Sequence, residues 1–339
     1  MKAIILLSGG LDSTLAAELM SREGLELLAV NFKTPFCLCD RHSSNLGCGS
    51  NAHRVADSLG IDLKIINATE DFLEVLQKPA HGYGANMNPC IDCRILFFRK
   101  SRDLMEEYGA SFLITGEVLG QRPMSQFRHQ MDIIEREAGL QGLVVRPLSA
   151  KLLAPTIPEK NGWISRERMC DIAGRSRKPQ IALARNLGIK DYPCAAGGCL
   201  LTDPEFAGRI RDLINHGELD MQNINLLKSG RYFRLSHNAK LIVGRNEGEN
   251  KMLVMLAKDG DFIFEPQDIN GPVAVGKGSF APDLLNVSCR IVARYCDRNG
   301  EAYADVSCRW LPNGQWMTIR SSYLDDDDLA RLRTLTDAA

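Results

Sequence analysis

The chain has 339 residues, about twice the length of a typical domain, which favours two domains. Its 41 Lys and Arg residues balance 42 Asp and Glu residues. The net charge therefore provides no overall positive potential that would attract nucleic acid, and any basic surface must be local. The apolar N-terminal run is too short for a signal peptide, and no stretch is long enough to span a membrane, so we expect a cytoplasmic location and no membrane partner.

The first part of the chain alternates short apolar runs with amphipathic segments. Strands are predicted at residues 3–7, 27–32, 63–66, 112–115 and 143–145, and helices at 12–23, 51–59, 90–108 and 125–137. This alternation predicts an α/β fold with a doubly wound parallel sheet.

Further along, helices are predicted at residues 178–187 and 204–214. After residue 225, β-type runs at 232–235, 240–243, 261–264, 273–275, 289–295 and 303–308 are divided by Gly, Asn and Asp turns. They predict a second, β-rich α+β domain, with a helix starting in the acidic run 325–328. We place the two domains at residues 1–205 and 206–339.

The segment Ser8-Gly9-Gly10-Leu11-Asp12-Ser13 directly follows the first predicted strand and opens a helix. Glycines without a Cβ let backbone N–H groups approach a phosphate at a helix N-terminus. The segment is neither a Walker A motif nor G-x-G-x-x-G, which disfavours the usual kinase, GTPase and dinucleotide interpretations. The alternative is a glycine turn in which Asp12 and Ser13 only cap the helix.

The string S-G-G-x-D-S at the end of a first strand resembles the pyrophosphate loop (PP-loop) of the N-type ATP pyrophosphatases, which have an adenine nucleotide alpha hydrolase-like fold. The resemblance implies cleavage of ATP between its α and β phosphates and transfer of AMP to a substrate oxygen, with Mg²⁺ offsetting the charge. It implies phosphate binding by Ser8, Gly9, Gly10, Asp12 and Ser13, and a catalytic role for Asp12. Adenosine contacts are expected at Asn31 and Phe32, where an ordinary strand end is the alternative.

Two other segments are candidates for phosphate or substrate contact. Gly116 ends the fourth predicted strand, at the face where a doubly wound sheet collects ligands, and Arg122 and Gln126 follow it. Lys178 lies in the tract Gly174–Gln180, where three cations surround a helix start. A solvated helix face is the alternative for these cations.

Eleven cysteines in a chain without an export signal favour metal or sulfur chemistry over a disulfide framework. The segment Asn88-Pro89-Cys90-Ile91-Asp92-Cys93 begins a predicted helix, whose positive end favours thiolate. With Cys199, this C-x-x-C can supply three ligands to a [4Fe-4S] cluster and leave one iron open. Cys194 could replace or compete with Cys199. A redox C-x-x-C and a zinc site, in which Cys194 would be the fourth ligand, are the alternatives.

The N-P-C-x-x-C segment is similar to the N-P-[CD]-x-x-C of tRNA 2-thiouridylases, and C-x-x-C with a distant cysteine resembles the iron-sulfur-dependent tRNA thiolases, including short forms of 4-thiouridine synthetase. The resemblance implies that Cys90, Cys93 and Cys199 are catalytic and hold a cluster whose sulfide attacks the adenylated base. A cluster-free form would use a persulfide, with Cys93 and Cys199 as the reacting pair.

Cys37, Cys39, His42 and Cys48 follow the second predicted strand, at a spacing that could close around zinc. A loop with reduced thiols is the alternative.

In the second domain, five basic residues are interleaved with two aromatic ones: Lys228, Arg231, Arg234, Lys240 and Arg245 with Tyr232 and Phe233. Side chains of these types can pair with phosphates and stack on bases. The run Ile242-Val243-Gly244-Arg245-Asn246, followed by Glu249-Asn250, resembles the V-G-R-N…N core of the NFACT RNA-binding domain over roughly residues 228–318. The aromatic-His signature of that family is replaced by Ile263-Phe264-Glu265-Pro266.

Together these features predict an ATP-dependent tRNA sulfurtransferase that adenylylates O4 or O2 of a uridine, or O2 of a cytidine, and takes its sulfur from sulfide or a persulfide carrier. An AMP-forming amidotransferase-like PP-loop ATPase and a non-enzymatic RNA-binding adaptor with structural zinc are the alternatives.

Overall fold

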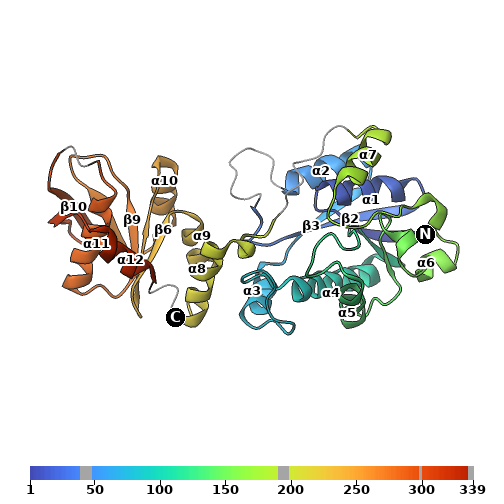
Figure 1. The fold of residues 1–339 in the computed structure, drawn as a ribbon, viewed down its shortest axis with the longest axis horizontal. Coiled ribbons are helices and arrows are strands. Elements are labelled where there is room, and N and C mark those ends of the chain that lie inside the picture. Colours follow the sequence, from blue (N-terminus) through green and yellow to red (C-terminus); the bar gives the residue numbers. More distant parts are fainter. Residues whose placement is uncertain (39–47, 190–197, 298–299, 335–339) are drawn as a thin grey trace. The chain divides into compact units, whose positions relative to one another are not determined.

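The computed structural model describes residues 1–38, 48–189, 198–297 and 300–334. The chain divides into two compact units, Met1–Thr202 and Asp203–Ala339, shown in Figure 1. The boundary predicted after residue 205 lies in the first turn of helix α8 (Pro204–Asn215), which belongs to the second unit.

The first unit is built on a five-stranded parallel sheet in the order β3-β2-β1-β4-β5. The strands are β1 (Lys2–Leu6), β2 (Glu26–Lys33), β3 (Asp62–Asn67), β4 (Phe112–Thr115) and β5 (Val144–Val145). Its helices are α1 (Leu11–Ser21), α2 (Cys48–Leu59), α3 (Thr69–Gln77), α4 (Cys90–Tyr108), α5 (Arg128–Ala138), α6 (Ile157–Lys160) and α7 (Lys178–Asn186), with 3₁₀ turns η2 (Ala150–Leu152), η3 (Arg166–Arg168) and η4 (Leu200–Thr202).

Helices cover both faces of this sheet because successive strand residues point to opposite sides. Ile5 packs with residues of α1 and α2, whereas its neighbours Ile4 and Leu6 pack with residues of α4 and α5, and Figure 1 shows the two pairs of helices on either side of the strands. The predicted doubly wound α/β fold is confirmed. The order reverses at β1, so the carboxyl ends of β1 and β4 form the switch point where such sheets bind ligands.

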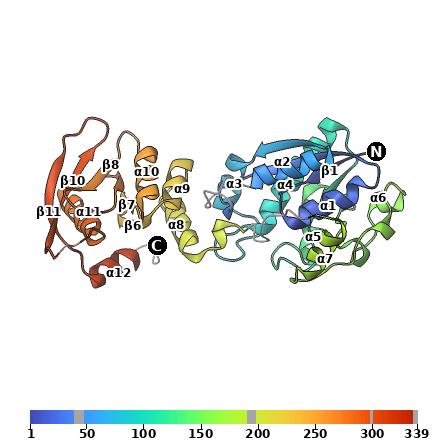
Figure 2. The same ribbon diagram turned by 90° about the horizontal axis from the view of Figure 1, so that it is seen from above.

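The second unit holds a six-stranded antiparallel sheet in the order β11-β10-β8-β9-β7-β6. The strands are β6 (Arg231–Ser236), β7 (Ala239–Val243), β8 (Phe262–Pro266), β9 (Ala274–Gly278), β10 (Tyr303–Trp310) and β11 (Met317–Ser322). Besides α8, its helices are α9 (Met221–Lys228), α10 (Glu247–Leu256), α11 (Pro282–Arg294) and α12 (Asp326–Thr334) (Figure 2). The predicted β-rich α+β architecture is confirmed.

One predicted strand of this unit is wrong, because residues 289–295 lie mostly in α11. The Ile, Val and Tyr of that run suggested a strand. However, Pro282 opens a helix, and Leu285, Cys289 and Val292 follow at three-to-four-residue spacing and are buried in the core.

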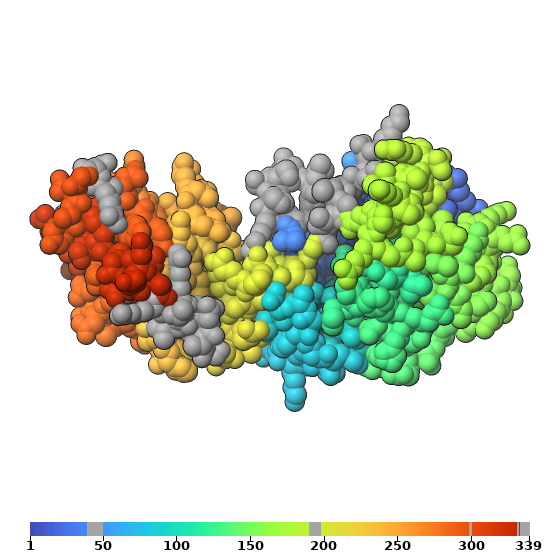
Figure 3. Space-filling model, viewed as in Figure 1, coloured from blue at the N-terminus to red at the C-terminus, as the bar shows by residue number. Residues whose placement is uncertain are grey.

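Helix α10 forms a light-orange protrusion of the second unit (Figure 3). It carries three exposed apolar side chains, those of Met252, Val254 and Met255. Among the described helices of the protein, none has both the length and the apolar character that crossing a membrane requires. The cytoplasmic location expected from the sequence stays a prediction.

Candidate active site

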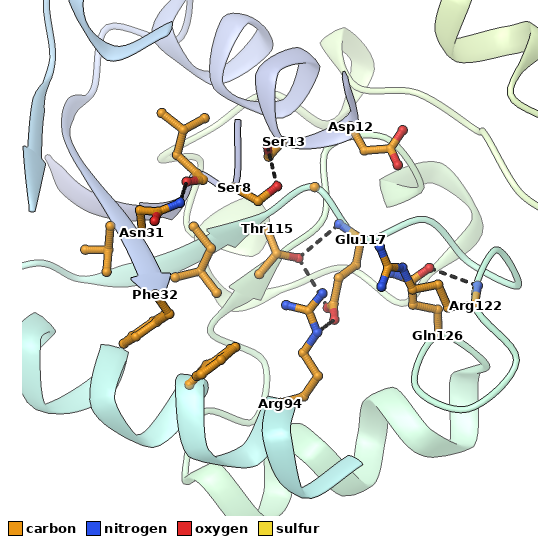
Figure 4. A pocket seen from close by; sticks show the side chains of 15 residues that line it. Ser8, Asp12, Ser13, Asn31, Phe32, Arg94, Thr115, Glu117, Arg122 and Gln126 are labelled. Carbon is orange, nitrogen blue, oxygen red and sulfur yellow. Dashed lines mark hydrogen bonds and ion pairs between the residues drawn. The ribbon is translucent and has the colours of Figure 1, made fainter. Parts of the chain in front are cut away.

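A pocket lies at the switch point of the parallel sheet (Figure 4). Its empty volume is about 660 Å³, including the part open to solvent. Its lining comes from the ends of β1, β2 and β4, the start of α1, helix α4 and the loop after β4: Leu6, Leu7, Ser8, Asp12, Ser13, Val30, Asn31, Phe32, Arg94, Phe97, Thr115, Gly116, Glu117, Arg122 and Gln126.

The loop between β1 and α1 is closed by short side-chain hydrogen bonds. The Ser8 and Ser13 hydroxyl oxygens lie 3.0 Å apart, and the hydroxyls of Ser13 and Thr14 each donate to the Gly10 carbonyl at 3.0 Å. Gly9 has a φ of 75°, which favours glycine. The bonds hold the loop at the N-terminus of α1, where a helix has N–H groups without intrahelical partners and attracts anions.

Position 116 requires glycine because the end of β4 lies in close contact with the start of α1. A Cβ at this position would lie 2.6 Å from both the Asp12 carbonyl carbon and the Ser13 nitrogen. The end of β4 therefore packs directly on the first turn of α1, and any larger residue would push the phosphate loop away.

Asp12 lies at the pocket with one oxygen bonded and one without a partner. Its Oδ2 accepts a 2.7 Å hydrogen bond from Gln121 Nε2, and Gln121 Oε1 accepts one of 3.1 Å from Gln180 Nε2 of α7. Its Oδ1 is buried and has no hydrogen-bond partner. A buried carboxylate oxygen without a donor suits a hard cation such as Mg²⁺. The sequence analysis gave neither Gln121 nor Gln180 a role at Asp12, because contacts between neutral amides distant in the chain carry no motif.

Asn31 and Phe32 both reach the pocket from β2, and each also has a structural contact. Asn31 Nδ2 donates a 2.7 Å hydrogen bond to the Leu7 carbonyl, which fixes the end of β1. The Phe32 ring stacks on Phe97 of α4 at 4.6 Å between centroids and 3° between planes. The stacked pair gives the pocket an apolar wall on the side of β2 (Figure 4).

Arg94 and Arg122 bring positive charge into the pocket. Arg94 lies 3.4 Å from Glu117, and the same carboxylate accepts a 3.0 Å bond from Arg146, which also pairs with Glu135. Burial alone would raise the pKa of Glu117, but Arg146 and Arg94 lower it below its ordinary value. Burial, together with the neighbouring Arg94, lowers the pKa of Arg122.

The cysteines of the N-P-C-x-x-C segment occupy the first turn of α4. The Asn88 side-chain amide donates a 3.0 Å hydrogen bond to Cys90 Sγ. Asp92, between the two cysteines, turns away from them and accepts hydrogen bonds of 3.1 Å from the Ala80 and His81 backbone nitrogens.

Cys199 is brought to the same place by backbone hydrogen bonds on two sides. It pairs with Cys37 in an isolated antiparallel bridge, and Met87, just before the N-P-C segment, donates a 3.1 Å bond to the Leu201 carbonyl. These bonds bring the Cys199 segment next to the start of α4, which carries Cys90 and Cys93.

These thiols adjoin the pocket through the two arginines. Burial raises the pKa of Cys93 to about 12, opposed by Arg94 and Arg122, and burial also raises the pKa of Cys199 to about 12. The helix N-terminus was expected to favour thiolate, but for Cys93 burial outweighs that effect and raises the pKa. No group of three or more His, Cys, Asp or Glu residues in the described part of the chain is arranged to hold a single metal ion.

Several predicted site residues lie elsewhere or outside the described residues. Cys39, His42 and Cys194 are not described, and Cys48 begins α2 without a described side chain. Cys37 lies opposite Cys199. Lys178 is exposed at the start of α7 and does not line the pocket.

The prediction of an RNA-contact surface around residues 232–240 of the second unit is wrong, because its central side chains are not at the surface. Tyr232, Phe233, Arg234 and Lys240 are buried. Arg234 pairs with Asp212 and Glu218, Lys240 with Glu218, and the Tyr232 hydroxyl with Asp212. Residues 228–245 contain no acidic residue, so the segment looked basic. Its acidic partners, Asp212 and Glu218, come from α8 and the turn after it.

The fold and the pocket define an α/β nucleotide-binding type of domain joined to a separate β-rich domain. Residues 1–141 match the family model described as the tRNA methyl transferase HUP domain, and residues 230–331 match that of the NFACT protein RNA binding domain. These matches and the relatives below confirm the resemblances to the tRNA 2-thiouridylases and to the NFACT RNA-binding domain, whereas the resemblance to the iron-sulfur-dependent tRNA thiolases stays a prediction.

Curated relatives match part of the chain. The chain is 26% identical over 223 residues to the tRNA-specific 2-thiouridylase MnmA of Xanthobacter autotrophicus, covering 62% of this chain and 54% of that protein. It is 32% identical over 125 residues to the MnmA of Pelobacter propionicus, covering 34% of this chain and 33% of that protein. The chain thus spans about half or less of the length of these relatives.

Solved structures give a weaker match. The predicted subunit of tRNA methyltransferase from Methanocaldococcus jannaschii is 19% identical with a TM-score of 0.31, over 44% of this chain and 67% of that one. That similarity is too low to bear on the function.

Proposed function

We propose that this protein is an ATP-dependent tRNA sulfurtransferase, which adenylylates a carbonyl oxygen of a uridine or cytidine and replaces it with sulfur. One observation carries the proposal: a Met87–Leu201 hydrogen bond brings the Cys199 segment to the start of α4, which carries Cys90 and Cys93, and Arg94 of the same helix lines the phosphate-loop pocket with Arg122. A nucleotide site and a sulfur site that share two cations suit a reaction in which AMP leaves the carbon that sulfur attacks.

The pocket residues have distinct parts in the adenylylation step. The loop Ser8–Ser13 and the N-terminus of α1 would hold the phosphates, while the stacked Phe32 and Phe97 offer an apolar wall for the adenosine. Mg²⁺, which would offset the phosphate charge, fits Asp12, whose Oδ1 is buried without a partner. Arg94 and Arg122 would stabilise the charge that develops as pyrophosphate and then AMP depart.

The three cysteines would hold the sulfur. We favour a [4Fe-4S] cluster bound by Cys90, Cys93 and Cys199, because the cations at Arg94 and Arg122 would offset the negative charge of a thiolate-bound cluster. The cluster would supply an open iron for sulfide. A persulfide on Cys199 is the second form of the same proposal, supported by the pairing of Cys199 with another thiol at Cys37.

The second unit would bind the tRNA, through a face other than the one first expected. On β10, Ala304, Val306 and Cys308 point into the core, so Tyr303 and Arg309 point to the opposite face. There the Arg309 guanidinium lies 4.8 Å from the Trp316 ring and that of Arg320 lies 5.4 Å from the Tyr303 ring. Tyr303 and Trp316 are about half exposed. Such paired cations and rings suit stacked bases and phosphates.

The reaction is tested with purified protein, unmodified tRNA, ATP, Mg²⁺ and a sulfide source. We expect AMP and pyrophosphate to form only with tRNA, and one thiolated nucleoside to appear by mass spectrometry. ADP as the product, or AMP formation that ignores tRNA, would contradict the proposal.

The form of the sulfur carrier is tested by iron and acid-labile sulfide analysis of anaerobically purified protein. The cluster form predicts about four irons per chain, lost in Cys90→Ser and Cys93→Ser. Cys170→Ser, in a half-buried cysteine outside the site, is the matched control and should keep the iron. Protein that is free of iron but makes the thiolated nucleoside would establish the persulfide form.

A further inference from the structure

Cys37 and Cys199 lie directly opposite each other in an antiparallel bridge. The Leu38 N–H donates to the Gly198 carbonyl at 3.1 Å, and the Leu200 N–H donates to the Phe36 carbonyl at 2.8 Å. Because these bonds flank the two cysteines, the cysteines form a non-hydrogen-bonded pair. In such a pair the Cα atoms are about 4.5 Å apart, and both side chains leave on the same face.

This geometry matches what a disulfide needs. Disulfides join residues whose Cα atoms are about 4.4 to 6.8 Å apart. Neighbours hold both segments in place: Phe36 is buried and packs on Phe72 at 5.6 Å between ring centroids, and Leu200 and Leu201 are fully buried. The two sulfurs could therefore join without a large backbone movement.

We propose that Cys37 is a catalytic thiol that resolves the sulfur carried by Cys199, through a Cys37–Cys199 disulfide. The inference rests on the proposed function in its persulfide form. It replaces Cys93, the partner expected from the family resemblance, which lies in α4 and has no backbone pairing with Cys199.

The reaction balances as two sulfur exchanges. The terminal sulfur of the Cys199 persulfide attacks the adenylated carbon, a C–S bond forms, and the C–O bond to AMP breaks. The Cys37 thiolate then attacks Cys199 Sγ, which breaks the bond to the base-linked sulfur and forms the Cys37–Cys199 disulfide. The base keeps the reduced sulfur, and its ring nitrogen takes up a proton equivalent to the one that Cys37 lost. A dithiol reductant must return the two cysteines to thiols before the next turnover.

The test is a single turnover with the full chain, a persulfide donor, ATP and tRNA, without reductant, followed by peptide mapping under non-reducing conditions. We expect the Cys37 and Cys199 peptides to be linked. In Cys37→Ser, the tRNA should stay joined to Cys199 by a disulfide, with pyrophosphate released normally, and added dithiothreitol should free the thiolated tRNA. Cys170→Ser should behave like the wild-type protein.

A second measurement avoids the tRNA reaction. Oxidation of the tRNA-free protein with diamide should link Cys37 to Cys199 in preference to Cys93, and Cys37→Ala should not form this link.

A Cys93–Cys199 link after turnover, or thiolation with no disulfide, would overturn the role of Cys37 and leave the proposed function standing. Absence of any thiolated nucleoside from the wild-type protein under all sulfur sources would instead defeat the proposed function.

Discussion

Gly116 shows how one missing side chain sets the shape of the phosphate loop. Its Cα faces the backbone of Asp12 and Ser13 so closely that a methyl group would lie 2.6 Å from both. The backbone at the start of α1 cannot move without displacing the Ser8–Ser13 loop. A side chain at position 116 would therefore distort this loop.

We therefore expect Gly116→Ala to weaken ATP binding and to lower stability by about 1–3 kcal/mol, the usual range for overpacking. Calorimetric titration of ATP and urea unfolding would measure the two effects. Gly248→Ala is the matched control, because Gly248 is a helical glycine of the second unit with room for a methyl group. Equal behaviour of the two variants would show that the contact at Gly116 is unimportant.

Glu117 links the pocket to the interior of the first unit by accepting from Arg146 while it faces Arg94. Its pKa is lowered in the folded protein. The ionised carboxylate therefore stabilises the fold above its unfolded pKa, about 4.3, and this contribution is lost as the pH falls through the lower folded value.

Accordingly, Glu117→Gln should be less stable than the wild-type protein at pH 7 by roughly 1–3 kcal/mol, and the difference should shrink below about pH 4. Urea unfolding across this pH range measures it. Glu301→Gln, at an exposed position, should show little difference at any pH. A Glu117→Gln deficit that stays constant with pH would mean that packing, and not charge, explains the loss.

At the scale of elements, β10 and β11 offer the exposed aromatic side chains that β6 and β7 do not. The rings of Tyr303 and Trp316 each lie near an arginine on this sheet edge, whereas Tyr232 and Phe233 belong to the interior. Stacking of bases should therefore depend on the β10 and β11 edge.

Trp316→Ala is expected to weaken tRNA binding by about 1–3 kcal/mol, the usual contribution of one stacked base, and Arg309→Ala should also reduce its salt dependence. Filter binding at several salt concentrations measures both. Met255→Ala removes an exposed apolar side chain from α10 and should bind like the wild-type protein. If Met255→Ala weakened binding and Trp316→Ala did not, the contact surface would be the α10 side of the unit.

Element prediction succeeded where the pattern was local. The bounds of β4 and α4 match the predicted ranges, because an apolar run or a long amphipathic stretch contains its own signal. The strand predicted at 289–295 is wrong because a short apolar run is compatible with either a strand or a helix. Pro282 and the spacing of the buried positions, both of which indicate a helix, lie partly outside that run.

At the scale of the whole molecule, each unit has its own hydrophobic core. One core surrounds α11 and the antiparallel sheet, and the others lie on the two faces of the parallel sheet. Because each of these cores lies within one unit, each unit should fold by itself.

Separate expression of residues 1–202 and 203–339 should give two folded proteins with cooperative thermal unfolding. The second should bind tRNA alone, and the first should still make AMP, with a KM for tRNA raised by about 10²-fold or more because the tethered binding site is lost. Steady-state kinetics of the first fragment, with and without the second added in trans, is the measurement. A kcat loss without a KM change would instead place catalytic residues in the second unit.

The sequence alone determined the phosphate loop, the two cysteines of α4 and the division into two types of domain, because each is written in consecutive residues whose chemistry acts locally. Tertiary structure decided what depends on chain segments meeting: the approach of Gly116 to Asp12, the pairing of Cys199 with Cys37, and the burial of Tyr232 and Arg234 against Asp212. Those contacts depend on sheet order and helix packing, and no single stretch of sequence specifies them.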